Sequence, residues 1–393
     1  MNKIKVGFLL SFVSVATVSA AMITPALPII RSEFHLADSE MDWLISIFLL
    51  GYLIGQLMYA PIANSFGRLK ALRIGFGLNL LGVIVCLHAI HIKNYPLILL
   101  GRFIAALGSS SGLSCTFMLV HESLSKNAAR SAISFIMLPV TVGLGLAVAL
   151  GGILTEYFYW GDCFWVLLFH GIIVYFGTYL FKETLKQKTP FRLFKILGGY
   201  ASTLKSANLI MSSFIGSLFP VIVYCNSAAS PLIAHRSLGL SPSEYGYWNC
   251  INMIGMFFSS FAANYFLKYF KCNIIMKYSL FGIFACLVSL GVLIITSEVN
   301  TLWFFISTTF LFFAGGVLFP CASLKATHET SDRANTSAMM SFVSEASALL
   351  SVIILDYLPG ASILTFTLII FGFFILASIF FNIVKKNPNT LAV

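Results

Sequence analysis

Two charged residues lie deep inside long apolar runs of this chain: Arg102 in the run 96–120 and Glu345 in the run 336–355. A charge in the middle of an apolar segment is costly, so it usually serves a function. Glu345 is the only acid placed so deeply, and it can take up and release a proton because burial disfavours the charged form of a carboxyl. We therefore name Glu345 as a candidate proton carrier. The alternative is a structural hydrogen bond.

Arg102 keeps its charge, because a guanidinium does not lose its proton in proteins. It can bind an anionic group or influence a neighbouring acid, so we group it with Glu345 as a candidate for proton coupling. The alternative is a structural donor to backbone carbonyls. His88 and His170, each alone in an apolar run, are weaker candidates for carrying a proton.

The composition excludes several classes of protein. Of 393 residues, 59% are hydrophobic and 10% are charged, and the mean hydropathy is +0.92. Soluble domains have about 25% charged residues. A water-soluble fold cannot hide so much apolar surface, which argues against a soluble enzyme, a nucleic-acid binder or a disordered scaffold. No Walker A loop is present, so ATP is not the expected energy source. The eight cysteines are scattered singly, which indicates small core residues and predicts neither a metal site nor a cofactor.

Each helix that crosses a membrane needs roughly 20 mainly apolar residues. The first apolar run does not read as a cleaved signal peptide, because it continues to Ile30 through two prolines and eleven more runs follow. We count twelve runs, at about 6–30, 41–63, 71–92, 96–120, 131–155, 163–181, 207–230, 243–267, 274–296, 301–326, 336–355 and 360–384.

The charges predict the orientation of these spans. The net charge is +10, and with the N-terminus inside, nearly all of the 24 Lys and Arg residues fall in inward-facing segments. Only Arg31, Lys93 and Arg236 fall outside. Since cytoplasmic loops retain positive charge, both termini are expected in the cytoplasm. Four tryptophans near the outer span ends predict an aromatic belt: Trp43, Trp160, Trp165 and Trp303.

The chain divides into two halves. Residues 182–206 are basic with interspersed apolar residues, which indicates a cytoplasmic linker with a short amphipathic helix. The predicted domains are therefore a six-helix bundle over 1–181, this linker, and a second six-helix bundle over 207–393.

Short motifs recur at matching places in the two halves. Residues 63–68 (ANSFGR) end the second span, and 263–268 (ANYFLK) end the eighth. His121-Glu122-Ser123 precedes Ser131-Ala132, as His328-Glu329-Thr330 precedes Ser337-Ala338. Such 6+6 repeats build transporters in which two bundles rock around a central site.

Several stretches resemble the major facilitator superfamily, and within it the Bcr/CflA-type drug–proton antiporters. Residues 49–61 (LLGYLIGQLMYAP) and 67–70 (GRLK) resemble the family's second span and first cytoplasmic loop. Residues 101–108 (GRFIAALG) look like its fourth-span motif, with Arg102 as the motif arginine, and 143–160 (GLGLAVALGGILTEYFYW) resemble its antiporter motif. In the second half, similar signatures lie at 226–231, 238–242 and 315–320.

The resemblance implies an all-α integral membrane fold of twelve transmembrane helices in two pseudo-symmetric six-helix bundles. It also implies gating roles for Asn64, Gly67 and Arg68 at the inner side. The small face of the fifth span would meet the eighth span and help to close the outer side; its residues are Gly143, Gly151 and Gly152. Small residues let helices approach closely in lipid, so tight packing is the alternative role of this face. Gly67 permits a turn, and Arg68 could be only a topology anchor.

The chain departs from the family pattern at three places. Asn64 and Ser65 stand where the family usually has an acid and an arginine, and Ala147-Val148 replaces a Gly-Pro pair. Ala21 stands near the family's usual first-span acid, so the usual first-half carboxylate for proton coupling is missing. These departures argue against a generic exporter of cationic drugs.

Polar and aromatic residues on the spans that line the family's cavity are the candidate substrate-binding residues. They are Gln56, Tyr224, Asn226, Asn249 and Asn252.

These observations predict a monomeric, proton-coupled secondary transporter of a bacterial inner membrane. Its partners would be a small-molecule substrate, protons and the lipid bilayer, and its expected activity is efflux of drugs or metabolites that are small and amphipathic. An alternative keeps the fold and changes the cargo to an acidic or zwitterionic metabolite, such as a carboxylate siderophore, moved in either direction. A membrane-embedded sensor is a third possibility, disfavoured because the longest cytoplasmic segment is the 182–206 linker.

Overall fold

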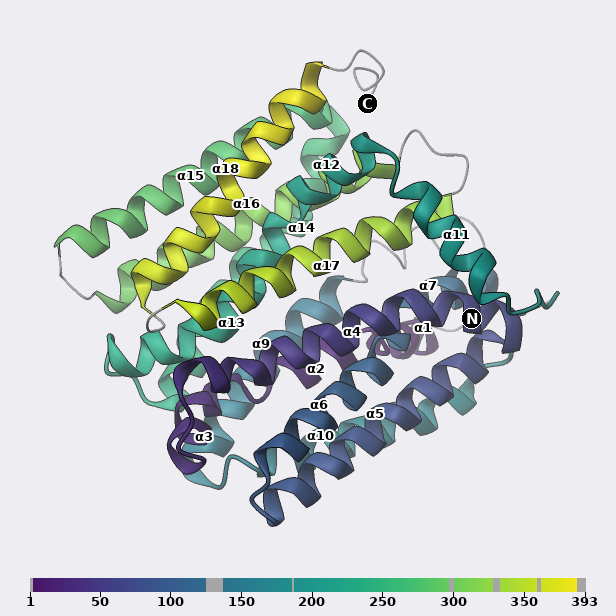
Figure 1. Ribbon diagram of the computed structural model, residues 1–393, viewed down its shortest axis with the longest axis horizontal. Coiled ribbons are helices and arrows are strands. Elements are labelled where there is room, and N and C mark those ends of the chain that lie inside the picture. The colour runs from purple at the N-terminus through teal and green to yellow at the C-terminus, as the bar shows by residue number, and fades with distance from the viewer. Residues whose placement is uncertain are drawn as a thin grey trace. The chain divides into compact units, whose positions relative to one another are not determined.

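The computed structural model describes residues 3–124, 137–185, 187–296, 300–327, 333–358 and 362–386. Within these ranges the regular structure is entirely helical (Figure 1). Twelve helical segments are long and apolar enough to cross a membrane. The all-α fold with twelve spans is therefore confirmed.

The helices of the first half lie between Lys3 and Leu180. They are α1 (Lys3–Ser11), α2 (Ser14–Ala21), η1 (Thr24–Ala26), α3 (Leu27–Glu33), α4 (Asp38–Phe66), α5 (Arg68–His91), α6 (Tyr95–Ser109), α7 (Ser111–Ser123), α9 (Met137–Tyr157), α10 (Asp162–Gly177) and η2 (Thr178–Leu180).

The linker helix and the helices of the second half follow. They are α11 (Leu193–Thr203), α12 (Ala207–Gly216), α13 (Leu218–Arg236), α14 (Pro242–Tyr269), α15 (Cys272–Thr296), α16 (Thr301–Thr327), α17 (Arg333–Tyr357) and α18 (Ile363–Lys386).

The described residues form two compact units. The first contains the chain up to Leu193 without Asp38–Asp42, together with Pro242–Gly246 at the start of α14. The second contains Asp38–Asp42 and the rest of the chain from Phe194 onward. The division between Leu193 and Phe194 falls inside the segment 182–206. The bounds 1–181 and 207–393 for the two six-helix bundles stay predictions.

Serine residues interrupt two of the spans that hydropathy shows as continuous. The hydroxyls of Ser109, Ser110 and Ser111 each donate to the carbonyl three residues earlier, and α6 ends there before α7 begins. Ser217 donates in the same way to Phe214 and separates α12 from α13. Serine bonds of this kind bend helices. The predicted seventh span, 207–230, is thus divided at Ser217 into α12 and α13, and α13 continues to Arg236.

Glycines bring α5 and α6 into close contact. A Cβ atom on Gly82 would lie 2.5 Å from the carbonyl oxygen of Gly101, and one on Gly75 would lie 2.8 Å from that of Gly108. The two helix backbones therefore touch, as small residues allow in lipid. This packing fixes the position of Arg102 on α6.

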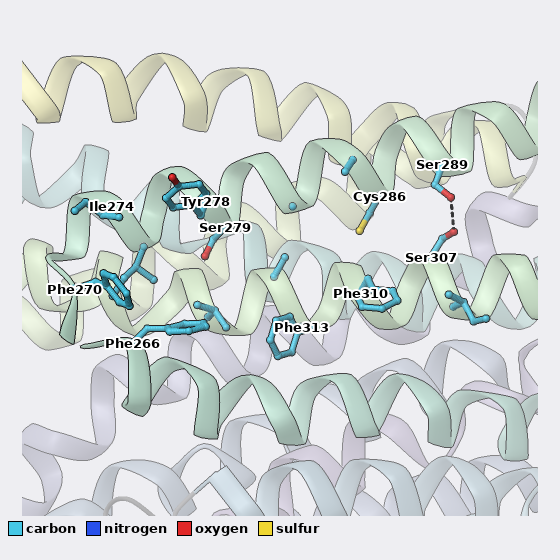
Figure 2. Close-up of a pocket in the computed structure, with 16 residues that line it drawn as sticks. Phe266, Phe270, Ile274, Tyr278, Ser279, Cys286, Ser289, Ser307, Phe310 and Phe313 are labelled. Carbon is cyan, nitrogen blue, oxygen red and sulfur yellow. Dashed lines mark hydrogen bonds between the residues drawn. The ribbon is translucent and has the colours of Figure 1, made fainter. Parts of the chain in front are cut away.

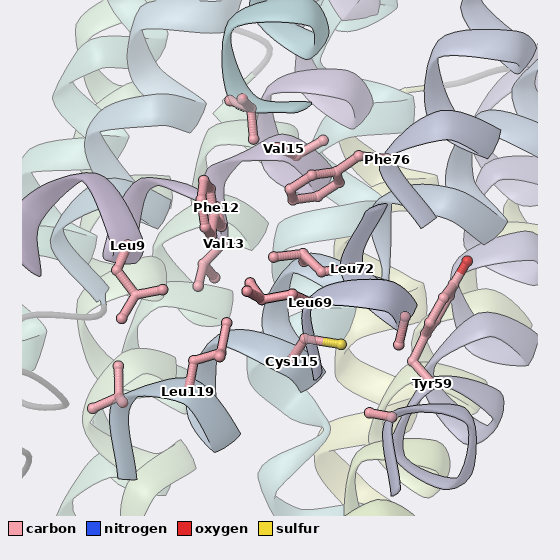
Figure 3. Close-up of a cluster of buried hydrophobic side chains, with 14 of the residues drawn as sticks. Leu9, Phe12, Val13, Val15, Tyr59, Leu69, Leu72, Phe76, Cys115 and Leu119 are labelled. Carbon is pink, nitrogen blue, oxygen red and sulfur yellow. The ribbon is translucent and has the colours of Figure 1, made fainter. Parts of the chain in front are cut away.

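A buried cluster joins α1, α2, α4, α5, α7 and α10 in the first unit (Figure 3). The rings of Phe12 and Phe76 pack edge to face at its centre, 5.7 Å between centroids. Leu72 and Leu119 belong to the same cluster. The cluster holds the end of α4 and the start of α5 in place, where Asn64 and Arg68 lie.

The predicted aromatic belt is wrong for one of its residues. Trp160 is 1% exposed, and its indole Nε1 donates to Glu33 Oε2 at 2.5 Å. A buried indole needs an acceptor, and Glu33 supplies one inside the first unit. Trp43 and Trp165 are exposed, as an interfacial position requires.

Some of the predicted repeat lies outside the described residues. This holds for Ser131-Ala132, for His328-Glu329-Thr330 and for the start of the predicted fifth span, 131–136. The other pair is described: residues 63–68 pass from α4 to α5, whereas 263–268 lie within the last turns of α14.

Candidate functional site

Glu345 lies on α17 in the second unit. Its side chain is half-buried, and its Oε2 atom is buried without a hydrogen-bond partner among the described residues. The preceding residue, Ser344, donates to the carbonyl of Ser213 at 3.3 Å and ties α17 to α12. A carboxyl oxygen in this setting has nothing to offset the loss of its hydration. Its hydrogen-bonding capacity at Oε2 is left for a proton or a ligand.

Arg102 lies on α6 and is 1% exposed. Its Nη1 donates to the carbonyl of Ser19 at 2.5 Å, and the guanidinium carbon lies 4.3 Å from the centroid of the Phe48 ring. In the part of the chain that the structure describes, its Nε and Nη2 atoms are buried and have no hydrogen-bond partner. Nε and Nη2 form the edge of the guanidinium that can hold a carboxylate through two hydrogen bonds. The guanidinium therefore donates to a backbone carbonyl through Nη1, and its Nε–Nη2 edge is available to a ligand.

Three of the predicted substrate-binding residues come together in the second unit. Asn252 Nδ2 donates to Asn249 Oδ1 at 3.0 Å, and Asn226 Nδ2 lies 3.5 Å from the same oxygen. All three side chains are buried. Asn226 Oδ1 is buried without a partner. The group joins α13 to α14 and leaves one acceptor unsatisfied.

Two threonines of α16, which the sequence does not single out, complete this polar group. The hydroxyls of Thr308 and Thr309 donate to Asn252 Oδ1 at 2.9 and 3.0 Å. Nothing in the sequence distinguishes them from other helical threonines, which commonly bond only to their own backbone. Of the remaining candidates, Tyr224 is half-buried on α13, and Gln56 is half-buried on α4 of the first unit.

Arg68 is the centre of a charged cluster in the first unit. Its Nη2 donates to Glu122 Oε1 at 2.8 Å, its Nε lies 3.2 Å from the same oxygen, and its Nη1 donates to Asn64 Oδ1 at 2.6 Å. Arg68 therefore does more than anchor topology, because it links α5 to α7 and to the end of α4. Glu122 was visible in the sequence only as part of a repeated motif.

Glu183, from the segment after η2, caps the N-terminus of α5. Its carboxylate accepts four backbone N–H groups, those of Arg68 (2.9 Å), Leu69 (3.1 Å), Thr184 (3.0 Å) and Leu185 (3.1 Å). Burial acts to raise the pKa of this carboxyl, but these backbone donors outweigh burial and hold the pKa below its ordinary value. The acid also suits the positive end of the helix dipole.

Gly67 makes this cap possible. Its φ is 121°, a conformation that side-chain-bearing residues rarely adopt, and a Cβ atom there would lie 2.5 Å from Glu183 Oε2. This positive φ agrees with the prediction that Gly67 permits a turn. Its gating role remains a prediction.

The small face of α9 packs inside the first unit. A Cβ atom on Gly143 would lie 3.2 Å from Ser14 Cβ, and one on Gly151 would overlap the carbonyl of Met22. Gly152 lies against the carbonyl of Pro242, which groups with this unit. These contacts account for the glycines as packing residues. Their role in closing the outer side remains a prediction.

Comparison with known proteins decides the family. A family model of the Major Facilitator Superfamily matches residues 8–353. The chain belongs to the Major Facilitator Superfamily. Members of this family are multi-pass membrane transporters of small molecules rather than enzymes.

Curated relatives within the Major Facilitator Superfamily are distant in sequence. A bicyclomycin resistance protein homologue from Haemophilus influenzae is 22% identical over 252 residues, which is 63% of this chain and 62% of that one. An uncharacterized transporter from Rickettsia bellii is 22% identical over 275 residues, 68% of this chain and 65% of that one. The matches thus span less than two-thirds of these relatives.

Solved structures of the Major Facilitator Superfamily share the fold along nearly the whole chain. A D-xylose-proton symporter superposes with a TM-score of 0.72 at 15% identity, covering 98% of this chain and 97% of that one. The inward open conformation of the xylose transporter XylE from E. coli gives a TM-score of 0.76 at 13% identity, covering 97% and 95%. At these identities the likeness shows the fold alone.

Proposed function

We propose that this transporter is proton-coupled, lies in a bacterial inner membrane with both termini in the cytoplasm, and exports small amphipathic molecules as a monomer by alternating access. The observation that carries the proposal is the unpartnered, buried Oε2 of Glu345, the one acid deep in a predicted span. The bicyclomycin resistance homologue supports export as the direction and drugs as the class of cargo.

In this mechanism Glu345 takes a proton from one side of the membrane and releases it to the other as the two bundles rock. A carboxyl suits this exchange because it can be neutral in one state and charged in the other. Each charge that moves down a potential of about 100 mV supplies about 2.3 kcal/mol. That energy is available to drive cargo against its gradient.

A second cargo class is favoured by one observation. The Nε–Nη2 edge of Arg102 is free, and this edge fits a carboxylate. An acidic or zwitterionic metabolite, such as a carboxylate siderophore, would satisfy it. Ala21 at the usual place of the first-span acid is in keeping with a cargo that is not cationic.

The two cargo classes can be separated in liposomes that contain the purified protein and an internal pH indicator. A transported compound should move protons when it is added outside, and empty liposomes provide the control. We expect proton movement with amphipathic drugs and dyes. Proton movement with carboxylate chelators, and none with drugs or dyes, would favour the second cargo class. Flux of labelled cargo without any proton movement would contradict proton coupling.

A further inference from the structure

The second unit has an apolar groove of about 670 Å³ between α14, α15 and α16. Phe266 and Phe270 lie at one end of it, and Ser289 and Ser307 at the other (Figure 2). Tyr278 and Phe310 on its walls are exposed. The groove thus opens on the outer surface of the unit, on helices long and apolar enough to lie in a membrane.

Small residues line part of this groove. A Cβ atom on Gly282 would make an ordinary contact with that of Ala314, at 3.4 Å, with no overlap. The matching helices of the first half, α5 and α6, pack backbone to backbone through their glycines instead. Small residues here therefore leave space rather than closing a helix pair.

The shape of the groove fits a hydrocarbon chain. From Ile274 to Ser289 along α15 it extends about 22 Å at a rise of about 1.5 Å per residue. The far end needs no polar ligand, because Ser289 and Ser307 hydrogen-bond each other at 2.9 Å and Trp303 Nε1 donates to Ser289 at 2.8 Å. An apolar, elongated occupant would leave no polar group of this end unsatisfied.

Three lysines follow one another in the sequence at the near end of the groove. Lys268, Lys271 and Lys277 are exposed beside Phe270 and Ile274. The sequence has no acid between residues 245 and 296, so no neighbouring carboxylate on these two helices offsets these lysines. An occupant with an anionic head and an apolar tail complements both ends of the groove.

We propose that this groove binds an anionic phospholipid, with one acyl chain between α15 and α16 and the phosphate beside the three lysines. Surface lysines attract anionic lipids, each contributing a factor of about five in affinity. This site is separate from Glu345 and from the asparagine group, and it requires neither a proton nor a cargo. Its failure would therefore leave the proposed function untouched.

The test uses the full-length protein in phosphatidylcholine vesicles that contain a small fraction of phosphatidylglycerol with a photoreactive diazirine on its acyl chain. After irradiation, digestion and mass spectrometry, we expect the label to concentrate on 274–289 and 306–317. Unlabelled phosphatidylglycerol should compete for this labelling, and added phosphatidylcholine should not. Labelling that is even over all lipid-facing helices, or equal with a phosphatidylcholine probe, would overturn the proposal.

Two variants sharpen the result. Gly282→Trp should fill the groove and remove the concentrated label, whereas Ile173→Trp, on an exposed position of α10, should leave it unchanged. The triple variant Lys268→Gln, Lys271→Gln, Lys277→Gln should lower labelling at least tenfold, given a factor of about five for each lysine. A matched triple variant is Lys182→Gln, Lys188→Gln, Lys205→Gln.

The lysine variant keeps the test decisive if Gly282→Trp does not fold. Equal losses in the matched triple variant would mean that only net charge matters, which contradicts a defined site. Displacement of the label by an amphipathic cargo dye but not by phosphatidylglycerol would assign the groove to cargo. Cross-links between two protein chains at these helices would assign it to a second copy.

Discussion

The guanidinium of Arg102 lies over the ring of Phe48, with its carbon 4.3 Å from the ring centroid. The ring face and the carbonyl of Ser19 are the described groups that stabilise this buried cation. No carboxylate is among the partners described for it. The relationship explains how α6 can hold a charge in an apolar bundle and still offer one edge of the guanidinium to a ligand.

Replacing Arg102 separates its two possible roles. Arg102→Ala should abolish transport while folded protein remains in the membrane, because the anion-binding edge is lost. Arg102→Lys should restore activity only in part, since lysine lacks the planar fork. Transport and the amount of folded protein are measured together in liposomes. Full activity of Arg102→Lys would show that a point charge suffices, and normal transport by Arg102→Ala would make the residue structural.

Among the three buried asparagines Asn226, Asn249 and Asn252, we expect Asn252 to be structural and Asn226 to bind cargo. Asn252→Ala removes the acceptor that Thr308 and Thr309 share and the close donor to Asn249 Oδ1, while both threonine hydroxyls keep backbone acceptors, so it should lower stability by roughly 0.5–1.5 kcal/mol. Asn226→Ala removes an acceptor without a described partner and only one long hydrogen bond, 3.5 Å to Asn249 Oδ1, so it should raise the KM for cargo with little change in thermal stability. Melting curves in detergent and transport kinetics read out the two effects. The opposite assignment of effects to the two variants would refute this division.

Asn64 should influence the inner gate. The amide oxygen of Asn64 accepts from Arg68 Nη1, and an amide holds a guanidinium more weakly than a carboxylate would, so we expect a resting state shifted toward inward-open. Asn64→Asp should move it toward outward-open. Single cysteines at positions 56 and 224, in a background without native cysteines, report accessibility from each side. An unchanged ratio of inside to outside labelling in the variant is the contrary result.

Glu183 should make the protein acid-sensitive. Its pKa is below the ordinary value in the folded state, so its stabilisation is complete above the unfolded pKa of about 4.3 and is lost as pH falls through the folded value. Glu183→Gln should therefore lower the melting temperature at neutral pH and converge with the native protein in acid. Gln187→Ala, an exposed change in the same segment, is the control. A pH-independent difference would mean that charge is not the cause.

Hydropathy predicted the twelve spans, because length and composition alone decide which segments can cross a membrane. It could not show the breaks at Ser110 and Ser217. A serine that bonds to its own backbone changes the helix axis without changing the hydropathy of the segment.

The sequence reveals the charged residues inside the predicted spans, but it does not reveal which residues contact them. Arg102 and Glu345 stand out because a charge is rare in an apolar run. The capping of α5 by Glu183 joins residues 115 apart in sequence, so only the folded chain reveals it. The hydrogen bond from buried Trp160 to Glu33 also joins residues far apart in sequence, so the sequence pattern does not predict it. The sequence pattern identifies which residue is unusual, whereas the tertiary contacts determine which residue it binds.

The central claim is that Glu345 carries the coupled proton. Glu345→Gln keeps the shape of the side chain and fixes a neutral form, so uphill transport driven by a pH gradient should be lost while downhill exchange of cargo remains. Glu345→Asp should retain coupling with a shifted pH optimum. The direct measurement is cargo accumulation in vesicles with and without an imposed pH gradient. Glu345→Gln should show no gradient-driven accumulation; accumulation against the gradient in this variant would contradict the claim and make His170 the next residue to test.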